Sequence, residues 1–440
     1  MRAVNPSPDL QAAYQPRDEL YLWWLAHPSQ PRLIGDLSLV MGHRSVGLRY
    51  ADEWLKSGFA LSQDLALRRG LFVPAEKDAA AGAVDDARPD RWGERVIRRF
   101  EKSARLSLLE FLLFAGDDRY GALGVSLQRE TYEPWPTAPA ARLADLPQMA
   151  EAVRKVLANE PVPELERRLI RPGVSLGGAR PKSLIQIDGQ PWLVKFSEGE
   201  DADTELMEHA AMTLAARCGI QVAATRALPV AGRHALAVRR FDRDVDGEGL
   251  DGEGLARRHA ISARVVLRAS GDAFGYPQLS QQLRRLAAAD AIAQAQQELF
   301  RRMVFNILID NTDDHEKNHA LLRQADGTYA LSPAFDVLPA AQGLGVQAMD
   351  VGERGTESSI DNAMSQAAAF GLRRDAAMKI VSAIAGVVDQ WKEHFQAAGV
   401  RDVDIQMLEQ YIDGANLGRQ RADVLATGRS AVPVSWSREK

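Results

Sequence analysis

The segment Asn311-Thr-Asp-Asp-His-Glu-Lys-Asn-His319 is the stretch that best indicates the fold and the chemistry of this chain. It follows an apolar, helix-like run and precedes two short strand-like runs joined by Asp326-Gly327. A dense polar cluster is therefore expected on a loop between two ordered elements. Loops held by a rigid scaffold are where catalytic side chains are often found.

Within this segment four residues separate Asp313 from Asn318. Kinase catalytic loops place an Asp and an Asn at this spacing: the Asp accepts the proton of the attacking hydroxyl, and the Asn holds a magnesium ion. Asp336 follows the second strand-like run, where kinases carry a further metal-binding carboxylate. The match is positional only, because Phe335 precedes this Asp and Val337 follows it. Oxygen ligands of this kind suit Mg²⁺.

Upstream, two β-rich runs, 183–187 and 192–196, flank Asp188-Gly189, which predicts a hairpin. Lys195 lies near the end of its second strand, where it could reach phosphates. A predicted helix over 204–218 carries two glutamates that could pair with Lys195, and the sequence leaves open whether Glu205 or Glu208 does so.

A glycine-bearing loop over 175–182 precedes the hairpin, in the position of a phosphate cover. Each of these features has a simpler explanation by itself: Lys195 could be an exposed strand lysine, and Asp313 to Asn318 a solvated turn. Together they follow the order found in kinases: loop, Lys, Glu, Asp with Asn, then Asp. Five weak signals in this order favour a kinase.

The rest of the chain predicts an α+β protein with a two-lobed, protein-kinase-like fold. We expect a loose leader (1–18), an N-terminal α/β subdomain (19–140), a small β-rich lobe (150–240) and a larger helical lobe (241–440). Prolines between 133 and 147 mark a boundary. Strands are predicted at 20–25, 45–51, 183–187, 192–196 and 234–238, and helices at 92–100, 106–114, 204–218, 279–289, 297–309, 373–397 and 405–412.

Composition narrows the class of protein. The 440 residues, 46% hydrophobic and 26% charged, are typical of a soluble globular chain of about two to three domains. A net charge of −5 does not indicate a polyanion binder. The single cysteine, Cys218, excludes an internal disulfide framework. With no signal-like N-terminus and no apolar run long enough to span a membrane, a cytoplasmic protein is expected.

Two other motifs are present, but each lacks a feature that its usual site requires. His315-Glu-Lys-Asn-His319 has the form of a zinc-hydrolase motif, but a zinc site needs both histidines on one helix face, and His319 runs directly into a strand-like segment. Gly177 to Ser183 ends like a Walker A loop, but Pro181 stands where a glycine is required and removes a backbone N–H donor.

Other conspicuous residues are predicted to be structural. The tryptophans at 23, 24, 92 and 391 are expected to be core or interface anchors rather than a base-stacking platform. The arginines at 91, 95, 98, 99 and 105 are expected on a solvated amphipathic helix rather than on a DNA-binding face. The repeat DGEGL at 246–250 and 251–255 predicts a surface loop.

The chain resembles the HipA-type serine/threonine kinases, the toxins of bacterial HipA/HipB toxin–antitoxin pairs. The resemblance covers most of the chain and rests on these segments: 88–97, 175–182, 194–196, Glu208 with 214–215, 240–243, 311–318 and 335–336. The blocks at 175–182 and 311–318 are the specific ones. Two features depart from the family pattern: Ala-Arg-Pro before Lys182, and the duplicated loop.

The resemblance implies a role for each matching residue. Asp313 would be the catalytic base, Asn318 and Asp336 would bind Mg²⁺, and Ser175 would be the loop serine whose autophosphorylation silences the kinase. Lys195 would contact the phosphates of ATP, and Arg239, Arg240 and Phe241 would form the hinge that meets adenine. The remaining residues assigned to nucleotide binding are Lys182, Gly177, Gly178, Ala179, His315, Lys317 and Glu208.

The resemblance also implies a protein serine as substrate, with aminoacyl-tRNA synthetases, glutamyl-tRNA synthetase in particular, as the known kind of target. Phosphorylation of such a target would halt translation and growth, the basis of persistence. A HipB-like helix-turn-helix antitoxin is implied as the partner, and any contact with DNA would depend on it. Two alternatives stay open: a small-molecule phosphotransferase of the aminoglycoside type, and a non-catalytic co-repressor that binds nucleotide without turnover.

Overall fold

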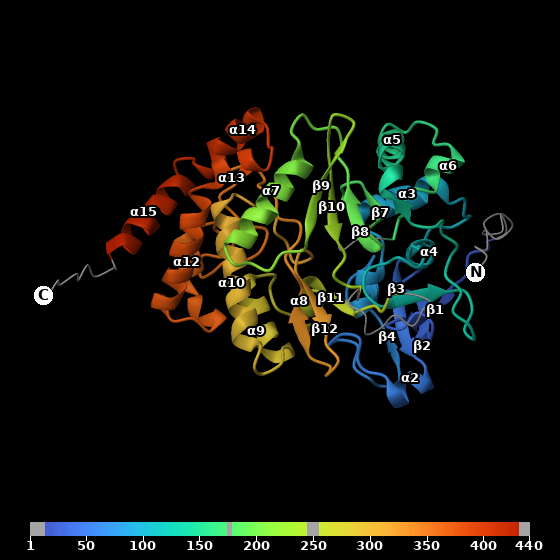
Figure 1. Cartoon of the computed structure of the whole chain (residues 1–440). Coiled ribbons are helices and arrows are strands. Elements are labelled where there is room, and N and C mark those ends of the chain that lie inside the picture. The colour runs from blue at the N-terminus through green and yellow to red at the C-terminus, as the bar shows by residue number, and fades with distance from the viewer. Residues whose placement is uncertain (1–13, 174–177, 244–254, 431–440) are drawn as a thin grey trace, which may run out of the picture. The chain divides into compact units, whose positions relative to one another are not determined.

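A computed structural model describes residues 14–173, 178–243 and 255–430 (Figure 1). The chain forms two compact units. The first contains residues 1–200, 224–272 and 317–332, and the second contains 201–223, 273–316 and 333–440. Neither unit is continuous in sequence, and the segment 311–319 is divided between them. The division into subdomains at 19–140, 150–240 and 241–440 stays a prediction.

The N-terminal sheet of the first unit has the strand order β4-β3-β2-β1-β5, with every neighbouring pair antiparallel. Its strands are β1 (Glu19–Trp24), β2 (Arg32–Val40), β3 (Ser45–Tyr50), β4 (Leu71–Phe72) and β5 (Leu123–Ser126). Helices α2 (Asp52–Ser57) and α4 (Leu108–Phe114) pack against it. The strands predicted at 20–25 and 45–51 are confirmed as β1 and β3.

A second sheet of the same unit has the order β6-β7-β8-β10-β9. Figure 1 labels its strands β7 to β10. The strands are β6 (Ala141–Arg142), β7 (Lys182–Ile187), β8 (Gln190–Lys195), β9 (Thr225–Val230) and β10 (Arg233–Arg239). The predicted hairpin is confirmed: Asp188 and Gly189 join β7 to β8 with φ angles of 54° and 75°. Two successive positive φ values are typical of the turn that an Asp-Gly pair favours.

Helices α3 (Arg91–Phe100) and α5 (Leu146–Leu157) supply the apolar cover of this second sheet. Trp92, Met149 and Val194, which come from α3, α5 and β8, belong to one buried cluster. Trp92 also donates a hydrogen bond from Nε1 to the Lys182 carbonyl at 2.8 Å. The short helix α6 (Glu164–Arg167) and the 3₁₀ turn η2 (Leu143–Asp145) complete this region.

A small third sheet, β11-β12-β13, lies beside the end of the 311–319 segment. Its strands are β11 (Ala260–Ser262), β12 (Ala320–Arg323) and β13 (Tyr329–Leu331), all antiparallel. Helix α8 (Ala263–Ser270) continues from β11 and packs against the 3₁₀ turn η1 (Gly82–Ala87). The hairpin predicted around Asp326-Gly327 is thereby confirmed.

His259, next to β11, is enclosed by apolar and aromatic groups of the first unit. It is 2% exposed, its Nε2 lies 2.9 Å from the Leu61 carbonyl oxygen, and the Trp24 ring lies 5.5 Å away. Burial lowers the pKa of His259 from 6.5 to about 4. Below pH 6.5 the unfolded chain therefore takes up a proton that the folded chain does not bind until about pH 4.

We expect His259 to make the fold acid-sensitive. Its contribution should lower the free energy of unfolding by about 2 kcal/mol between pH 7 and pH 5, from about 1.4 kcal/mol per unit of pKa shift. Urea unfolding of the wild type and His259→Gln at pH 5, 6 and 7 measures this, because all other titrating groups are shared. The loss between pH 7 and 5 should be smaller in the variant, and equal losses would contradict the assignment.

The second unit is helical (Figure 1). Its helices are α7 (Thr204–Arg217), α9 (Tyr276–Leu286), α10 (Ile292–Leu308), α11 (Ile360–Ser365), η3 (Ala367–Phe370), α12 (Arg374–Val388), α13 (Trp391–Ala397), α14 (Asp402–Ile412) and α15 (Leu417–Ser430). Helix α10 packs against α9, α12 and α15. The helices predicted at 204–218, 279–289, 297–309 and 405–412 correspond to α7, α9, α10 and α14.

The helix predicted over 373–397 is interrupted. Residues Asp389 and Gln390 separate α12 from α13, and Trp391 is 1% exposed. Arg421 of α15 pairs with Asp389 at 3.1 Å, and Trp391 donates a hydrogen bond to Asp413 at 3.2 Å. These tertiary contacts redirect the chain so that the tryptophan enters the core, which the local periodicity does not show.

The structural roles predicted for the tryptophans and arginines largely hold. Trp23, Trp92 and Trp391 are buried. The exposed arginines of α3 bind within the fold: Arg95 and Arg99 donate hydrogen bonds to backbone carbonyl oxygens between residues 156 and 160. In the part of the chain that the structure describes, no helix is both long and apolar enough to cross a membrane.

Candidate active site

The predicted catalytic aspartate lies in the turn that follows α10, in the second unit. Asp313 is exposed, whereas its neighbour Asp314 is 2% exposed. Asp314 accepts hydrogen bonds from the Tyr276 hydroxyl and, at 2.7 Å, from Nδ2 of Asn306. Because α9 and α10 both hold Asp314, the carboxylate of Asp313 is carried by a fixed backbone.

The same turn is anchored on its other side by residues 340–348. Asp310 has a φ of 56°, a left-handed conformation for a residue with a side chain. Its carboxylate accepts the backbone N–H groups of Gln342 and Gly343 at 3.3 and 3.2 Å, and the Ala348 N–H donates to the Thr312 carbonyl at 3.1 Å. Burial raises the pKa of Asp310, against these hydrogen bonds.

Asp336, the predicted metal-binding carboxylate of the second unit, is half-buried and has a φ of 61°. The backbone just before it is paired: Ala334 donates to the Gln221 carbonyl at 2.7 Å, and the Ala223 N–H donates to the Ala334 carbonyl at 2.9 Å. A non-glycine residue held in this conformation costs about 1–3 kcal/mol, and such residues concentrate at functional sites.

Helix α7 carries both candidate glutamates in buried positions. Glu205 is 1% exposed and Glu208 is 2% exposed. The Thr204 hydroxyl donates to Glu205 at 3.0 Å. Buried carboxylates need partners to offset their desolvation. Which of the two pairs with Lys195 stays a prediction, because α7 belongs to the second unit and Lys195 to the first.

In the first unit, Lys195 and Lys182 stand directly opposite each other on β8 and β7, so their side chains share one face of the sheet. Both are buried, at 6% and 4% exposure. Two adjacent ammonium groups repel, and Asp90, the N-cap of α3, offsets one of them with a 2.7 Å ion pair to the Lys182 Nζ. The face of β7 and β8 therefore presents a buried cationic pair.

Part of the glycine-bearing loop also meets this pair. Gly178 has a φ of 98°, and a Cβ built on it would lie 3.1 Å from the Lys182 Nζ. Glycine is thus favoured there by conformation and by space. Ala179 is exposed. Gly177 and Ser175, also predicted as site residues, lie outside the described residues.

The predicted hinge follows β10, in the first unit. Arg239 pairs with Trp192 of β8, and its N–H donates to the Ala224 carbonyl at 2.8 Å. Arg240 is 8% exposed; its N–H donates to the Pro191 carbonyl at 3.1 Å. Phe241 is half-buried. The Arg240 side chain is directed into the fold, so its part in a hinge would be structural.

Arg240 belongs to a buried charge network that sequence reasoning missed. Asp242 is fully buried and accepts hydrogen bonds from Arg240 Nε at 2.9 Å and from Arg243 Nη1 at 2.7 Å. Its carboxylate also accepts the Gly121 N–H at 2.8 Å. Burial raises the pKa of Asp242. The positive charges of Arg240 and Arg243 outweigh this effect and hold the pKa well below the usual range of an aspartate. The sequence alone singled out the segment 240–243, but it gave no indication that this segment bonds to the loop that contains Gly121.

The end of the 311–319 segment lies in the first unit. Asn318 is 5% exposed, and Lys317 is half-buried. The Ala263 N–H donates to the His319 carbonyl at 2.8 Å, which fixes the backbone just after Asn318. The predicted metal ligand Asn318 therefore lies directly before His319, whose carbonyl is hydrogen-bonded, and two residues before the start of β12.

Asp86, from the N-terminal part of the first unit, lies near the end of the 311–319 segment. Asp86 of η1 accepts the backbone N–H and the hydroxyl of Ser262 at 2.6 and 2.7 Å. Ser262 pairs with Ala320, just past Asn318. Burial raises the pKa of Asp86 to about 6, against the Ser262 hydrogen bonds and the charge of Lys317. Sequence reasoning had no signal for Asp86.

The rejected zinc motif does not form a helix. Residues 316 and 317 form a turn; His315 is half-buried and lies in the second unit, while His319 is buried in the first. Among the described residues, no three or more His, Cys, Asp and Glu side chains are grouped so that they could hold a metal ion. The two histidines therefore do not share one face of a helix, which this motif requires.

Comparison with known proteins identifies two matching families. A family model named HipA N-terminal domain matches residues 29–126, and one named HipA-like C-terminal domain matches residues 174–391. The solved Shewanella oneidensis HipA, from a complex with HipB and its operator DNA, superposes with a TM-score of 0.63 at 17% identity. The alignment covers 92% of this chain and 99% of that one. This similarity shows a shared fold.

Two curated relatives come from Sinorhizobium fredii. The protein named "Putative kinase Y4mE" is 25% identical over 362 residues, which cover 78% of this chain and 83% of the relative. "Putative kinase Y4dM" is 32% identical over 162 residues, 34% of this chain and 37% of the relative. The two family matches together span well over half of the chain in the expected order. The chain, an α+β protein, therefore belongs to the HipA-like family.

Proposed function

We propose that this protein is a serine/threonine protein kinase that uses ATP and Mg²⁺. The observation that carries the proposal is the pair of adjacent aspartates after α10: Asp314 is buried and hydrogen-bonded, and Asp313 is exposed on the backbone that Asp314 fixes. A catalytic base needs this combination of a rigid support and an accessible carboxylate. Relatives named as kinases support the same reading.

The donor set fits magnesium. Asn318 supplies an amide oxygen and Asp336 a carboxylate, and hard oxygen ligands are what Mg²⁺ takes in phosphoryl-transfer sites. The left-handed backbone at Asp336 is the kind of conformation that sites retain for function. When bound, the ion would neutralise charge on the phosphates, while Asp313 would accept the proton of the substrate hydroxyl.

The residues proposed for the nucleotide also fit an anion. Lys195 and Lys182 share one face of the sheet, and Asp90 forms an ion pair with Lys182. Buried ammonium groups on a sheet face are suited to bind phosphates, because a bound phosphate supplies the negative charge that a buried cation needs as a partner. We assign Lys195 to the phosphates, the backbone of 239–241 to adenine, and Lys182, Gly178, Ala179, His315 and Lys317 to supporting contacts. Glu205 or Glu208 would be the acidic partner of Lys195, and the choice between them stays open.

The partner and target are proposed from the family. The Shewanella oneidensis relative forms a complex with HipB and operator DNA. We infer a HipB-like antitoxin for this chain, with DNA contact depending on that partner because the net charge is −5. The substrate would be a protein serine, on an aminoacyl-tRNA synthetase such as glutamyl-tRNA synthetase, and its modification would halt translation.

The test of this proposal is transfer of labelled phosphate from ATP into a cell lysate, with the labelled protein then identified. One labelled protein, with transfer dependent on Mg²⁺, is the expected result. Label in a small molecule such as an aminoglycoside would instead indicate the small-molecule phosphotransferase. ATP binding without transfer to any lysate component would indicate the co-repressor.

Autophosphorylation at Ser175 is a separate prediction. We expect mass spectrometry to find one phosphate on this residue after the purified protein is incubated with ATP and Mg²⁺, followed by loss of transferase activity. Ser175→Ala should stay active over the same period, because it cannot accept the phosphate. Ser183, whose hydroxyl is buried and donates to the Leu169 carbonyl at 2.9 Å, serves as an internal control that stays unmodified. Inactivation without phosphate on Ser175 would contradict the prediction.

A further inference from the structure

Two exposed apolar side chains lie close to the exposed Asp313 in the second unit. Leu344 is 56% exposed and Val346 is 45% exposed. Among the described residues of this unit, Val403 is the only other large apolar residue that is exposed, at 62%. Exposed apolar residues scattered singly are common in proteins. A pair of them beside a candidate catalytic carboxylate is instead a surface on which a substrate could bind.

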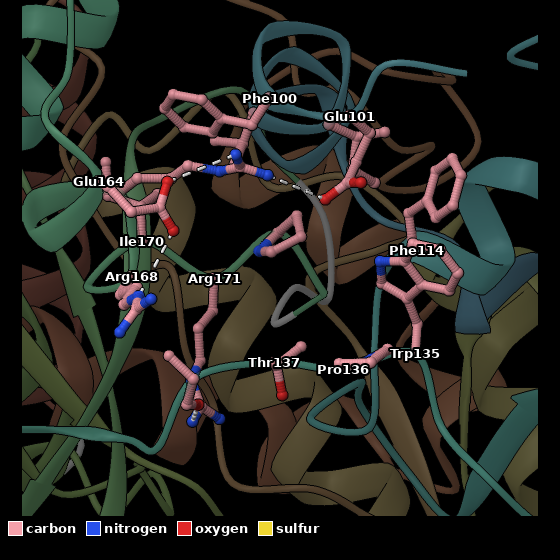
Figure 2. A pocket seen from close by; sticks show the side chains of 15 residues that line it. Phe100, Glu101, Phe114, Trp135, Pro136, Thr137, Glu164, Arg168, Ile170 and Arg171 are labelled. Carbon is pink, nitrogen blue, oxygen red and sulfur yellow. Dashed lines mark hydrogen bonds and ion pairs between the residues drawn. The ribbon is translucent and has the colours of Figure 1, made fainter. Parts of the chain in front are cut away.

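A cavity of the first unit gives no comparable indication of a partner (Figure 2). It has a volume of about 180 Å³ and is lined by α3, α6 and the segments 135–138 and 170–172. Charged side chains of its wall pair with one another, as Arg167 and Glu101 do at 3.4 Å. The rings of Phe114 and Trp135 pack together with their centroids 4.7 Å apart. These interactions account for the lining as part of the fold.

The loop that carries the apolar pair is bonded to the candidate catalytic turn at both of its ends. Before the pair, the Asp310 carboxylate accepts the Gly343 N–H at 3.2 Å. After the pair, the Ala348 N–H donates to the Thr312 carbonyl at 3.1 Å. Asp310 and Thr312 belong to the same turn as Asp313. The turn and the loop therefore hold each other in place.

Further backbone hydrogen bonds fix the loop from its other side. The Ser358 N–H donates to the Gly345 carbonyl at 2.9 Å, and the Gln347 N–H donates to the Thr356 carbonyl at 2.7 Å. These bonds hold the backbone immediately before and after Val346. The exposure of the apolar pair is thus set by a backbone that is hydrogen-bonded on two sides.

The distance from the pair to Asp313 limits what the pair can contact. Three backbone steps and one hydrogen bond connect Asp313 to Val346, so their Cα atoms lie no more than about 16 Å apart. An extended chain advances about 3.3 Å per residue. When the hydroxyl of a substrate serine reaches Asp313, a side chain within about five positions of that serine can therefore reach the pair.

We propose that Leu344 and Val346 form a docking surface for the protein substrate, and that they select a segment with an apolar side chain within about five positions of the phosphorylated serine. This inference rests on the proposed kinase function. Removing apolar surface of both partners from water would stabilise the complex. An aminoglycoside is polar and cationic and offers no apolar group of this kind, so the surface favours a polypeptide substrate.

A peptide library tests the inference. Each peptide contains one serine and one fixed residue near it, and labelled ATP with Mg²⁺ supplies the phosphate. The wild type should prefer apolar residues at a position within about five of the serine. Leu344→Asp should lose this preference and favour Lys or Arg there, because a carboxylate replaces the apolar side chain. For the best wild-type peptide, the KM of this variant should rise about tenfold while kcat and the KM for ATP stay unchanged.

Val403→Asp is the matched control, because it introduces the same charge at an exposed apolar position of the same unit. Val403 lies near the start of α14, eight residues before Tyr411. The loop approaches that helix at Tyr411, whose Cδ1 would lie 3.1 Å from a Cβ built on Gly343. Eight residues correspond to about 12 Å along a helix. Val403→Asp should therefore keep the peptide preference and the KM of the wild type.

Val346→Asp serves as the second variant should Leu344→Asp fail to fold. If the wild type labels lysate proteins but no peptide, the rate of lysate labelling replaces KM, and Leu344→Asp should be about tenfold slower than Val403→Asp. The inference is overturned if the wild type labels peptides without an apolar preference, or if the variants at 344 and 403 behave alike. Absence of transfer by the wild type to both peptides and lysate would refute the kinase function itself, and this inference with it.

Discussion

Replacing Asp313 by alanine is expected to abolish phosphoryl transfer and to leave the fold intact. Loss of a general base typically lowers a rate by roughly 10²–10⁴-fold. The Asp313 side chain is exposed, so its removal should change the free energy of unfolding by no more than about 0.5 kcal/mol. Labelled-ATP transfer measures the first effect, and urea unfolding the second. The affinity for ATP should stay near that of the wild type.

Asp314 is the matched control, because the neighbouring residue should give the opposite result. Asp314→Ala removes the carboxylate oxygen that accepts hydrogen bonds from Asn306 Nδ2 and from the Tyr276 hydroxyl. The lost hydrogen bonds should lower the free energy of unfolding by about 1–3 kcal/mol. Wild-type transfer by Asp313→Ala would refute the assignment of the base. Equal destabilisation by the two variants would show that Asp313 is structural.

The difference between these two aspartates shows how far the sequence could lead. The spacing to Asn318 selected Asp313, and the structure gives it the exposed position. Nothing local indicated that Asp314 would be buried, because its partners lie 8 and 38 residues away. Spacing can select a candidate residue, but which carboxylate is buried depends on the packing of α9 and α10.

Local signals predicted the elements that have strong local chemistry. Asp188-Gly189 and Asp326-Gly327 marked two hairpins, and the apolar period marked α7, α9 and α10. Short or weakly patterned elements were not predicted, among them β4, β6, α6 and α11. Their conformation depends on neighbours far away in sequence, as does the interruption at Asp389 and Gln390, which Arg421 and Asp413 stabilise.

The charge network around Asp242 is the clearest case of a feature that no local pattern predicts. It joins the segment 240–243 to the loop 117–121, which lies more than 100 residues earlier. Arg240 Nη1 donates to the Asp118 carbonyl at 2.8 Å, and Arg243 Nη2 donates to the Arg119 carbonyl at 2.9 Å. The two family-matched regions, 29–126 and 174–391, therefore meet in one buried network within the first unit.

Asp242→Ala should be among the most destabilising single substitutions in the chain. It would leave Arg240 and Arg243, each 8% exposed, without their shared carboxylate, and the Gly121 N–H without an acceptor. Removing one partner from a buried ion pair costs about 3–5 kcal/mol. Urea unfolding measures this loss. The Arg44–Asp78 pair of the same unit is the control: both side chains are more than half exposed, and Asp78→Ala should unfold at nearly the same urea concentration as the wild type.

The acid dependence of this loss identifies its cause. The pKa of Asp242 is lowered in the folded chain, so its stabilising contribution is complete above the ordinary aspartate pKa of 3.8 and declines as the pH falls below that value. The difference in stability between wild type and Asp242→Ala should therefore be constant from pH 7 to pH 5 and shrink below about pH 4. A difference that does not depend on pH would indicate lost packing rather than lost charge.

A substitution in this network also tests whether the N-terminal region influences nucleotide binding. If the backbone of 239–241 meets adenine as proposed, Asp242 fixes the end of that segment through Arg240, whose N–H is bonded to the Pro191 carbonyl at 3.1 Å. Asp242→Asn, studied below its unfolding transition, should then bind ATP more weakly than the wild type, whereas Asp78→Ala should not. Unchanged ATP affinity in a folded Asp242→Asn would confine the network to stability. Weakened affinity would make the loop 117–121 a route by which a partner on the N-terminal region could alter the kinase.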